Sequence, residues 1–308
     1  MNKTKNIEKS IVSGFQILRS YVKKNKFKDK KIDNFIYIYL LYIQKNYNLD
    51  LNFKNTKNEK TLLECTKFLY NNYSNKKIKN NLFSNNELLS ELYINDETFS
   101  PKKYLKKLSD KIYSTHYINI NIEIIDYLGN NEKDTELINN ALCLVFFKEL
   151  YPEISIDKKL IEHIISDIIV MANTFDVKNK AIIKYTNTHA IFILFLLKKI
   201  NKFPNLDDWI EKLISNQLYN GKWNNGFNSY FTSEPKYLDI IHTCLALIVL
   251  FEYKILMVHN LNKEEHNKKI KSHDNISDND NISDNDNISD NDNISDNDNI
   301  SDNDNISD

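Results

Sequence analysis

Two histidines open apolar segments of this sequence at corresponding positions. The segment "HAIFILFLL" begins at His189, and "HTCLALIVL" begins at His242, 53 residues further along the chain. Asn140 opens "NALCLVFF" in the same register. Polar side chains at such places are typical of helix starts, where backbone N–H groups are left open. If the apolar segments are helices that lie side by side, we expect these three side chains to gather at one end of them and to bind a ligand there.

Asp239 and His242 form the pair with the clearest chemical potential. They are three residues apart, so a helix carries both on one face. A carboxylate beside an imidazole favours the protonated ring, and His242 could then act as a proton donor near neutral pH. If metal were bound instead, neutral His242 would be a ligand with Asp239 beside it. The alternative interpretation is that both residues only cap a helix start.

Amphipathic and apolar segments alternate along residues 1–258. In the first segment, apolar side chains recur at spacings of three and four, at Ile7, Ile11, Phe15, Leu18 and Val22. This spacing indicates one face of a helix, whereas segments that are apolar all round indicate buried helices. The chain has only 4 Gly and 4 Pro, although sheet-rich folds need many turns. We therefore predict an all-α fold of helical hairpins, either a closed α/α toroid or an open α-solenoid.

Two stretches are harder to assign. Residues 32–44, "IDNFIYIYLLYIQ", alternate isoleucine and tyrosine as strands do, but the length of the run favours a buried helix. Residues 52–100 contain helix-like pieces such as "TLLECTKFLYNN" that fit neither the amphipathic nor the apolar layer.

Residues 274–308 repeat the hexad "DNISDN" and differ in charge from the rest. They hold 12 of the 42 acidic residues and no base, which leaves 41 basic and 30 acidic residues, a net charge of +11, in residues 1–273. One isoleucine per hexad buries too little apolar surface to offset chain entropy. We predict a helical domain over residues 1–258, a polar linker or helix extension over residues 259–273, and a disordered acidic tail.

The composition also bears on partners and location. Arg19 is the only arginine, and arginine dominates phosphate and base recognition, so a nucleic-acid partner is not expected. The most apolar run, residues 240–251, is shorter than the roughly 20 residues that span a bilayer, and no apolar signal core is present. The three widely spaced cysteines are predicted to be buried thiols. We expect a soluble, cytoplasmic protein without a membrane span.

One short motif suggests a fold family. Gln217, Gly221 and Trp223 in "QLYNGKW" match Q-x-x-x-G-x-W, between an amphipathic and an apolar segment. Glycine can take positive φ in the Asn220-Gly221 turn pair, and tryptophan supplies a large surface for packing. Gln217 can bond backbone groups left open at helix ends. Over residues 205–251, this order resembles the hairpin repeats of the terpenoid cyclase and protein prenyltransferase β-subunit class, which implies an α/α toroid.

The cyclase motifs of that class are incomplete in this chain. Class II cyclases share a D-x-D-D motif, which is absent from residues 1–273. Class I enzymes hold magnesium diphosphate on D-D-x-x-D/E, and Asp207, Asp208 and Glu211 match this pattern formally in "DDWIE". Acidic side chains in the first turn of a helix are also favoured by the helix dipole, and we prefer that structural interpretation.

The zinc site of the prenyltransferases is incomplete as well. The β-subunits bind zinc through an Asp-x-Cys element and a histidine in a segment like "YHTCYCL". The resemblance of "IIHTCLAL" to that segment makes His242 the only metal candidate. The Asp-x-Cys ligands are missing, because Ala141 stands two residues before Cys143. Cys244 falls about 200° around the helix from His242 and is predicted to be core.

Three classes of function follow from these residues. We favour a binding module for a small apolar ligand or a peptide, without standard cyclase or prenyltransferase motifs. The second class is a transferase or cyclase that acts on an isoprenoid-like or peptide substrate through a non-standard site of His242 and Asp239. The third is a polysaccharide-acting α/α barrel, which would need paired carboxylates. No cofactor is evident, and zinc would need other ligands than Asp-x-Cys.

Overall fold

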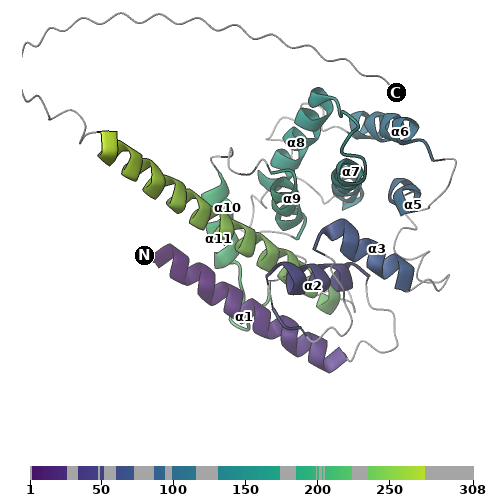
Figure 1. Ribbon diagram of the computed structural model, residues 1–308. Coiled ribbons are helices and arrows are strands. Elements are labelled where there is room, and N and C mark those ends of the chain that lie inside the picture. The colour runs from purple at the N-terminus through teal and green to yellow at the C-terminus, as the bar shows by residue number, and fades with distance from the viewer. Residues whose placement is uncertain are drawn as a thin grey trace, which may run out of the picture. The chain divides into compact units, whose positions relative to one another are not determined.

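The structure of the chain is a computed structural model. It describes residues 2–25, 34–47, 49–51, 60–72, 87–93, 99–115, 131–173, 185–198, 200, 203, 205–223 and 235–274. Its helices are α1 (Asn2–Asn25), α2 (Asn34–Asn46), α3 (Leu62–Asn72), α5 (Glu87–Tyr93), α6 (Pro101–Ser114), α7 (Asn131–Leu150), α8 (Lys158–Asn173), α9 (Tyr185–Leu196), α10 (Leu206–Ser215) and α11 (Pro235–Asp274) (Figure 1).

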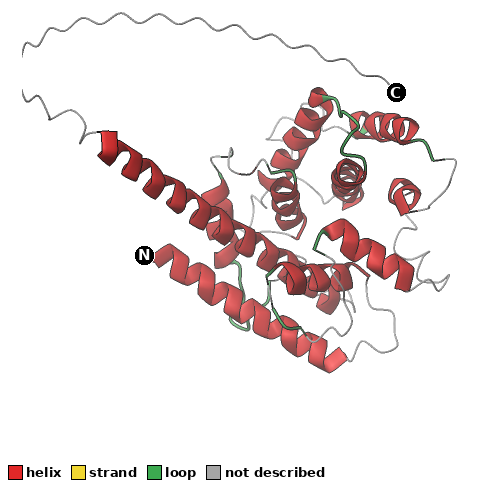
Figure 2. Ribbon diagram, viewed as in Figure 1, coloured by secondary structure: helices red, strands yellow, loops and turns green. Residues whose placement is uncertain are grey.

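The described residues are helices joined by loops and turns (Figure 2). The predicted all-α class is therefore confirmed for them. The run that alternates isoleucine and tyrosine is α2, a helix and not a strand. Its side chains are buried from Ile38 to Ile43, and this burial explains why the segment is apolar nearly all round.

The chain divides into two compact units, Met1–His259 and Asn260–Asp308. Helix α11 runs through the boundary and ends at Asp274. Residues 259–273, for which the sequence left a linker or a helix extension open, are therefore helical. The predicted acidic tail lies outside the described residues from Asn275 onward.

Amphipathic and apolar helices are buried to different extents. Helix α6 buries only Tyr104, Leu108 and Ile112, one side chain per turn. In contrast, every residue of α9 from 186 to 194, and every residue of α11 from 240 to 250, is buried. A helix buried on one face and helices buried all round are what the two spacing patterns predict.

Helices that are near in sequence pack together, and so do some that are far apart. Helix α2 contacts α3, α7 contacts α8, and α8 contacts α9. Helix α1 runs beside α11 in Figure 1, and Glu8 of α1 is 2.8 Å from the Nζ of Lys254. At the end of α2, the ring of Tyr47 stacks on Phe251 with centroids 4.3 Å apart. The pair α1 and α2 therefore lies against α11.

Helix α11 is more apolar and longer than the sequence suggested. Its segment Asp239–Asn267 is long and apolar enough to cross a membrane, by length and composition. The estimate from residues 240–251 was too short, because the apolar stretch continues past Phe251 through Leu256 and Met257. Within the protein, 67% of the apolar window is buried, and a buried core helix passes the same test.

Candidate functional site

The two predicted histidines both lie in the core, His242 on α11 and His189 on α9. His242 of α11 is fully buried, and its Nε2 is 2.8 Å from the Oγ1 of Thr188 in α9. His189 directly follows Thr188, and its own Nε2 is 2.9 Å from the hydroxyl of Tyr39 in α2. Both imidazoles thus point inward and meet a hydroxyl, as buried polar groups must. These contacts link α2, α9 and α11 in series.

Burial sets the charge of His189. It lowers the pKa of the ring to about 3, so the imidazole is neutral near pH 7. A neutral imidazole has one donor and one acceptor nitrogen, and a hydroxyl can complement either of them. His189 therefore offers a hydrogen bond, and it does not offer a proton at neutral pH.

The expectation that these polar residues start their helices is wrong. Helix α11 begins at Pro235 and α7 at Asn131, well before His242 and Asn140. The sequence places the polar residues where the apolar run begins, but each helix starts earlier, in a polar turn. Helix capping therefore does not explain Asn140 or His242, and both side chains contact other helices.

Asn140 contacts a different neighbour from the histidines. It is 1% exposed, and its Nδ2 donates to the Oγ1 of Thr115, at the end of α6, over 3.3 Å. The four side chains Asn140, Thr188, His189 and His242 are called the polar layer below. The side chain of Thr188 contacts His242 and is the chain neighbour of His189, while the described hydrogen bond of Asn140 runs to Thr115 at the end of α6.

Asp239 lies at the edge of the polar layer. Its side chain is half-buried, one turn before His242. Its backbone carbonyl accepts a hydrogen bond of 2.7 Å from the hydroxyl of Thr243, and that hydroxyl accepts one of 3.2 Å from the backbone N–H of Trp223. The hydroxyl of Thr243 therefore joins the backbone of Asp239 in α11 to the turn that precedes this helix.

The Q-x-x-x-G-x-W motif forms a tight turn against α1. Gly221 has φ of 85°, which confirms the predicted positive φ. A Cβ at this position would lie 2.6 Å from the backbone oxygen of Ser13, so the turn can approach α1 only with glycine. The Nε2 of Gln217 donates to the backbone oxygens of Gly221 and Ser10, each at 3.0 Å. These carbonyls belong to the turn and to the middle of α1, and not to helix ends as predicted.

Trp223 fills the space behind this turn. It is fully buried, and its Nε1 donates to the backbone oxygen of Leu213 in α10 over 2.6 Å. Its ring also contacts α1, because a Cβ added to Gly14 would lie 2.8 Å from the Cζ3 of Trp223. The predicted packing role between hairpins thus extends to α1.

The acidic residues of "DDWIE" have structural partners. Asp207 accepts a hydrogen bond from the hydroxyl of Tyr253 and lies 3.2 Å from the Nζ of Lys3. The Tyr253 hydroxyl lowers the pKa of Asp207, and Lys3 lowers it further. Glu211 is 3.5 Å from the same lysine. These two carboxylates therefore attach α10 to α1 and α11.

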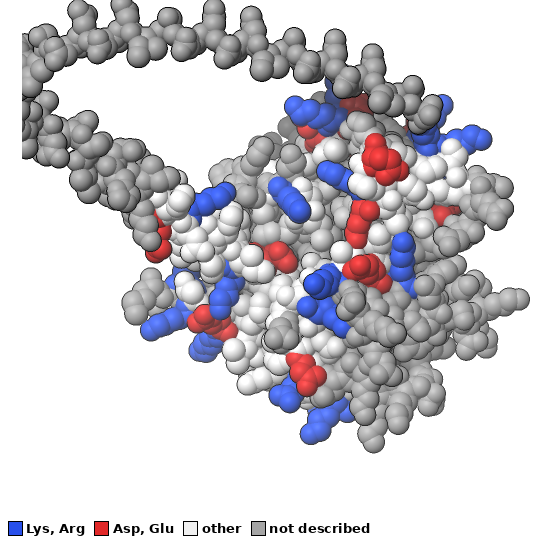
Figure 3. All heavy atoms as spheres, viewed as in Figure 1, with Lys and Arg blue, Asp and Glu red and all other residues white. Residues whose placement is uncertain are grey.

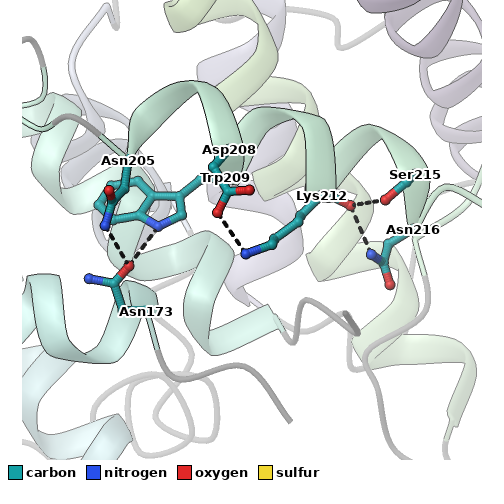
Figure 4. Close-up of polar contacts among 7 residues, drawn as sticks. All are labelled: Asn173, Asn205, Asp208, Trp209, Lys212, Ser215 and Asn216. Carbon is teal, nitrogen blue, oxygen red and sulfur yellow. Dashed lines mark hydrogen bonds and ion pairs between the residues drawn. The ribbon is translucent and has the colours of Figure 1, made fainter. Parts of the chain in front are cut away.

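The start of α10 is also attached to α8. Asn173 accepts two hydrogen bonds at its Oδ1, one of 2.9 Å from the Nε1 of Trp209 and one of 3.3 Å from the Nδ2 of Asn205 (Figure 4). Asn205 precedes α10 but makes no side-chain cap. Asp208 is paired within α10, 2.6 Å from the Nζ of Lys212 (Figure 4).

Charges of both signs share the surface in view. Figure 3 shows basic side chains (blue) interspersed with acidic side chains (red) over the described part of this face. Several lysines have carboxylate partners, including Lys111 with Glu136 at 3.0 Å and Lys158 with Glu162 at 3.5 Å. This mixture is typical of solvated helix faces.

The sequence also led to predictions about the cysteines and about metal ligands. Cys65, Cys143 and Cys244 are buried thiols that form no disulfide, as predicted, and burial raises the pKa of the Cys143 thiol to about 12. Within the described ranges, no three His, Cys, Asp or Glu side chains are grouped so as to hold a metal ion. No family model, curated protein or solved structure matches this chain.

Thr188 of the polar layer, and Tyr39, which bonds to His189 of that layer, are the residues that sequence reasoning missed. Thr188 could have been found, because it stands beside His189 in the same apolar segment. Tyr39 could not, because 150 residues separate it from His189. Together they provide neutral hydrogen-bonding groups inside an apolar core, which is the usual composition of a small-molecule site.

Proposed function

We propose that this chain is a ligand-binding module of the α/α-toroid type, and that the polar layer is its site. Its ligand is a small apolar molecule or peptide with one group that can form hydrogen bonds. The contact between Thr188 and His242 carries the proposal, because it joins one buried imidazole to the residue that precedes the second one in α9. Apolar pockets with a few such polar groups are the commonest ligand sites.

The toroid arrangement belongs to the same proposal. Outer and inner helices alternate in burial, as α10 and α11 do. Helix α1 contacts α10, and the end of α2 contacts α11, so segments from both ends of the unit meet. A closed ring of hairpins requires such contacts, whereas an open solenoid keeps its two ends apart. We also propose a soluble, cytoplasmic protein, because the apolar window of α11 is mostly buried and the cysteines are free thiols.

Binding is favoured over catalysis because the residues present suffice for it. A neutral imidazole can bond a carbonyl or hydroxyl without transferring a proton, and burial keeps His189 neutral. A transferase or cyclase would need His242 to exchange a proton with Asp239 or to hold a metal. Zinc and magnesium analysis of the purified protein separates the two roles, and stoichiometric metal would favour the enzyme.

The experiment that tests this proposal is a titration of the full chain with farnesol, an apolar alcohol, followed by calorimetry. His242→Gln should weaken binding at least tenfold, because glutamine keeps a polar group but cannot reproduce the placement of the ring. The matched control is His259→Gln, which changes an exposed histidine on the same helix. Unchanged binding in a folded His242→Gln protein would show that the polar layer is purely structural.

A further inference from the structure

The exposed face of α1 carries a row of basic side chains. Exposed residues recur along it at spacings of four, three, four, three and four, which keeps them in line on one side of the helix. They are Lys5, Lys9, Val12, Gln16, Arg19 and Lys23, and they are called the basic stripe below. At 1.5 Å of rise per residue, the basic stripe is about 27 Å long. One helix therefore presents four positive charges to solvent along a straight line.

The charges of the basic stripe lack nearby carboxylates. Within the described residues, none of its four cations forms an ion pair, whereas lysines of α6 and α8 pair with glutamates. Glu8 is the only acidic residue of α1, and it lies 2.8 Å from the Nζ of Lys254 in α11. The basic stripe therefore differs from the mixed charges of other helix faces, and its field attracts a negatively charged partner.

Exposed apolar and aromatic side chains accompany these charges. Val12, in the middle of the basic stripe, is 55% exposed. The turn between α10 and α11 packs beside it, because Gly221 lies against Ser13, the residue after Val12. Tyr219, at the tip of that turn, is fully exposed. Tyrosine is enriched where proteins meet the headgroups of a bilayer, so this combination of side chains suits the boundary between water and lipid.

We propose that the basic stripe adsorbs onto a bilayer rich in anionic phospholipid, with Tyr219 among the headgroups. Each basic side chain near such a surface strengthens binding roughly fivefold. Charges act over a Debye length, roughly 8 Å at physiological ionic strength, so the local stripe matters more than the net charge of −1. The apolar face of α1 is in the core, where Ile7 and Leu18 are fully buried, so the helix adsorbs without insertion.

Nucleic acid is the other polyanion that a basic stripe can meet. Three of the four cations are lysines, which are compact point charges, and Arg19 alone has the planar fork that bonds a phosphate twice. Contacts with a phosphate backbone also leave Val12 and Tyr219 without a role, whereas a headgroup layer receives both. These observations favour the bilayer, and binding of nucleic acid is an alternative outcome of the test.

Flotation of the full chain with vesicles tests the proposal. Vesicles of equal parts phosphatidylserine and phosphatidylcholine should bind the protein, and binding should weaken as salt rises, while pure phosphatidylcholine should not bind it. The double variant Lys9→Gln, Arg19→Gln should bind at least about tenfold more weakly. Its matched control, Lys102→Gln, Lys106→Gln, removes the same charge from exposed residues of α6 and should change binding by less than about twofold.

A third variant tests the aromatic contact. Tyr219→Ser should weaken vesicle binding roughly threefold, because a ring partly withdrawn from water contributes a fraction of full burial. Circular dichroism of each variant should match the parent protein, since all the changed side chains are exposed.

Four results would overturn the proposal. The first is a parent protein that does not bind the anionic vesicles. The second is an equal loss of binding in the two double variants, since it would reflect net charge and not the basic stripe. The third is unchanged binding in Tyr219→Ser, because charge alone would then account for the contact. The fourth is binding to a double-stranded DNA fragment in place of vesicles, which would assign the basic stripe to nucleic acid.

Discussion

The turn between α10 and α11 and the apolar region where α2, α3, α5 and α7 meet are both built from buried residues, but they are held together differently. At the turn, Gln217 and Trp223 donate side-chain hydrogen bonds to three backbone carbonyls. Gly221 approaches α1 so closely that a side chain would not fit. Where α2, α3, α5 and α7 meet, Leu89, Leu142 and their neighbours pack through carbon contacts.

This difference teaches which region can adapt. Directional hydrogen bonds and a glycine with positive φ fix one arrangement of the turn, because each has a narrow range of geometry. Apolar side chains can change rotamer and repack at small cost when their total volume is kept. We therefore expect substitutions to be most damaging at the turn, and volume-conserving substitutions to be tolerated best among the apolar side chains.

The largest effect should come from Trp223→Ala. Loss of a fully buried indole leaves a cavity between α1, α10 and α11 and should lower the free energy of unfolding by about 3–5 kcal/mol. Urea denaturation followed by circular dichroism measures it. The neighbouring Lys222→Ala is the control and should change stability by less than about 0.5 kcal/mol.

Gly221→Val extends that test to the backbone. Valine is strained at positive φ, and its Cβ would meet the oxygen of Ser13, so the variant should also be strongly destabilised. If Trp223→Ala and Gly221→Val both unfold like the parent protein, the turn is not the fixed point described here.

Acid should have the next largest effect, on the hydrogen bond between Tyr39 of α2 and His189 of α9. His189 has its pKa lowered to about 3 in the folded protein, so the unfolded chain binds the proton more readily. Stability contributed by the neutral ring is therefore lost as pH falls from the unfolded pKa, about 6.5, towards 3, and the loss should reach about 3 kcal/mol at pH 4. Denaturant titrations between pH 7 and pH 4 measure this slope. His189→Gln should flatten it, and an equal slope in the variant would assign the acid sensitivity to other groups.

A smaller effect is expected where α10 is attached to α1. Asp207→Ala removes the hydrogen bond from Tyr253 and the pairing with Lys3, but the Asp207 side chain is 69% exposed. Solvent screening limits the loss to about 1 kcal/mol. Asp208→Ala breaks only an exposed pair within α10 and should lose about 0.3–0.5 kcal/mol. Equal losses in the two variants would mean that Asp207 does not hold α10 in place.

The smallest effect should follow from removal of residues 274–308. One isoleucine in each hexad buries too little surface to contribute to a core, so Tm should stay within about 1 °C of the full chain. Differential scanning calorimetry at low and high salt measures it. A large loss of Tm that disappears in salt would show that the acidic repeats stabilise the basic remainder through charge.

Local patterns predicted much of the fold. Spacings of three and four placed the buried face of α1, with Ile7 and Leu18 fully buried. Apolar runs identified α9 and α11 as buried helices, and the Asn220-Gly221 pair predicted the positive φ. Each of these features depends on residues within a few positions of one another, which is what a sequence pattern records.

Long-range contacts and helix starts were not predictable in the same way. Nothing in the sequence relates Tyr39 to His189. No periodicity encodes the packing of α2, α3, α5 and α7 against one another either. The predicted starts of the helices were wrong for another reason. In α11, one mixed turn from Pro235 to Asp239 precedes the buried residues, so the apolar run at His242 marked burial and not the beginning of the helix.

The contacts of α1 have a consequence for how the chain folds during synthesis. Ser10 and Glu8 bond to residues 207 and 246 positions later, so the ribosome makes α1 long before its partners exist. Until then, the face of α1 that carries Ile7, Leu18 and Gly14 stays open to water and to other nascent chains. Contacts of such high sequence separation slow folding and prolong exposure of apolar surface. Chaperone dependence should therefore be greatest for nascent chains that stop before Trp223, and it should fall once α11 has left the ribosome.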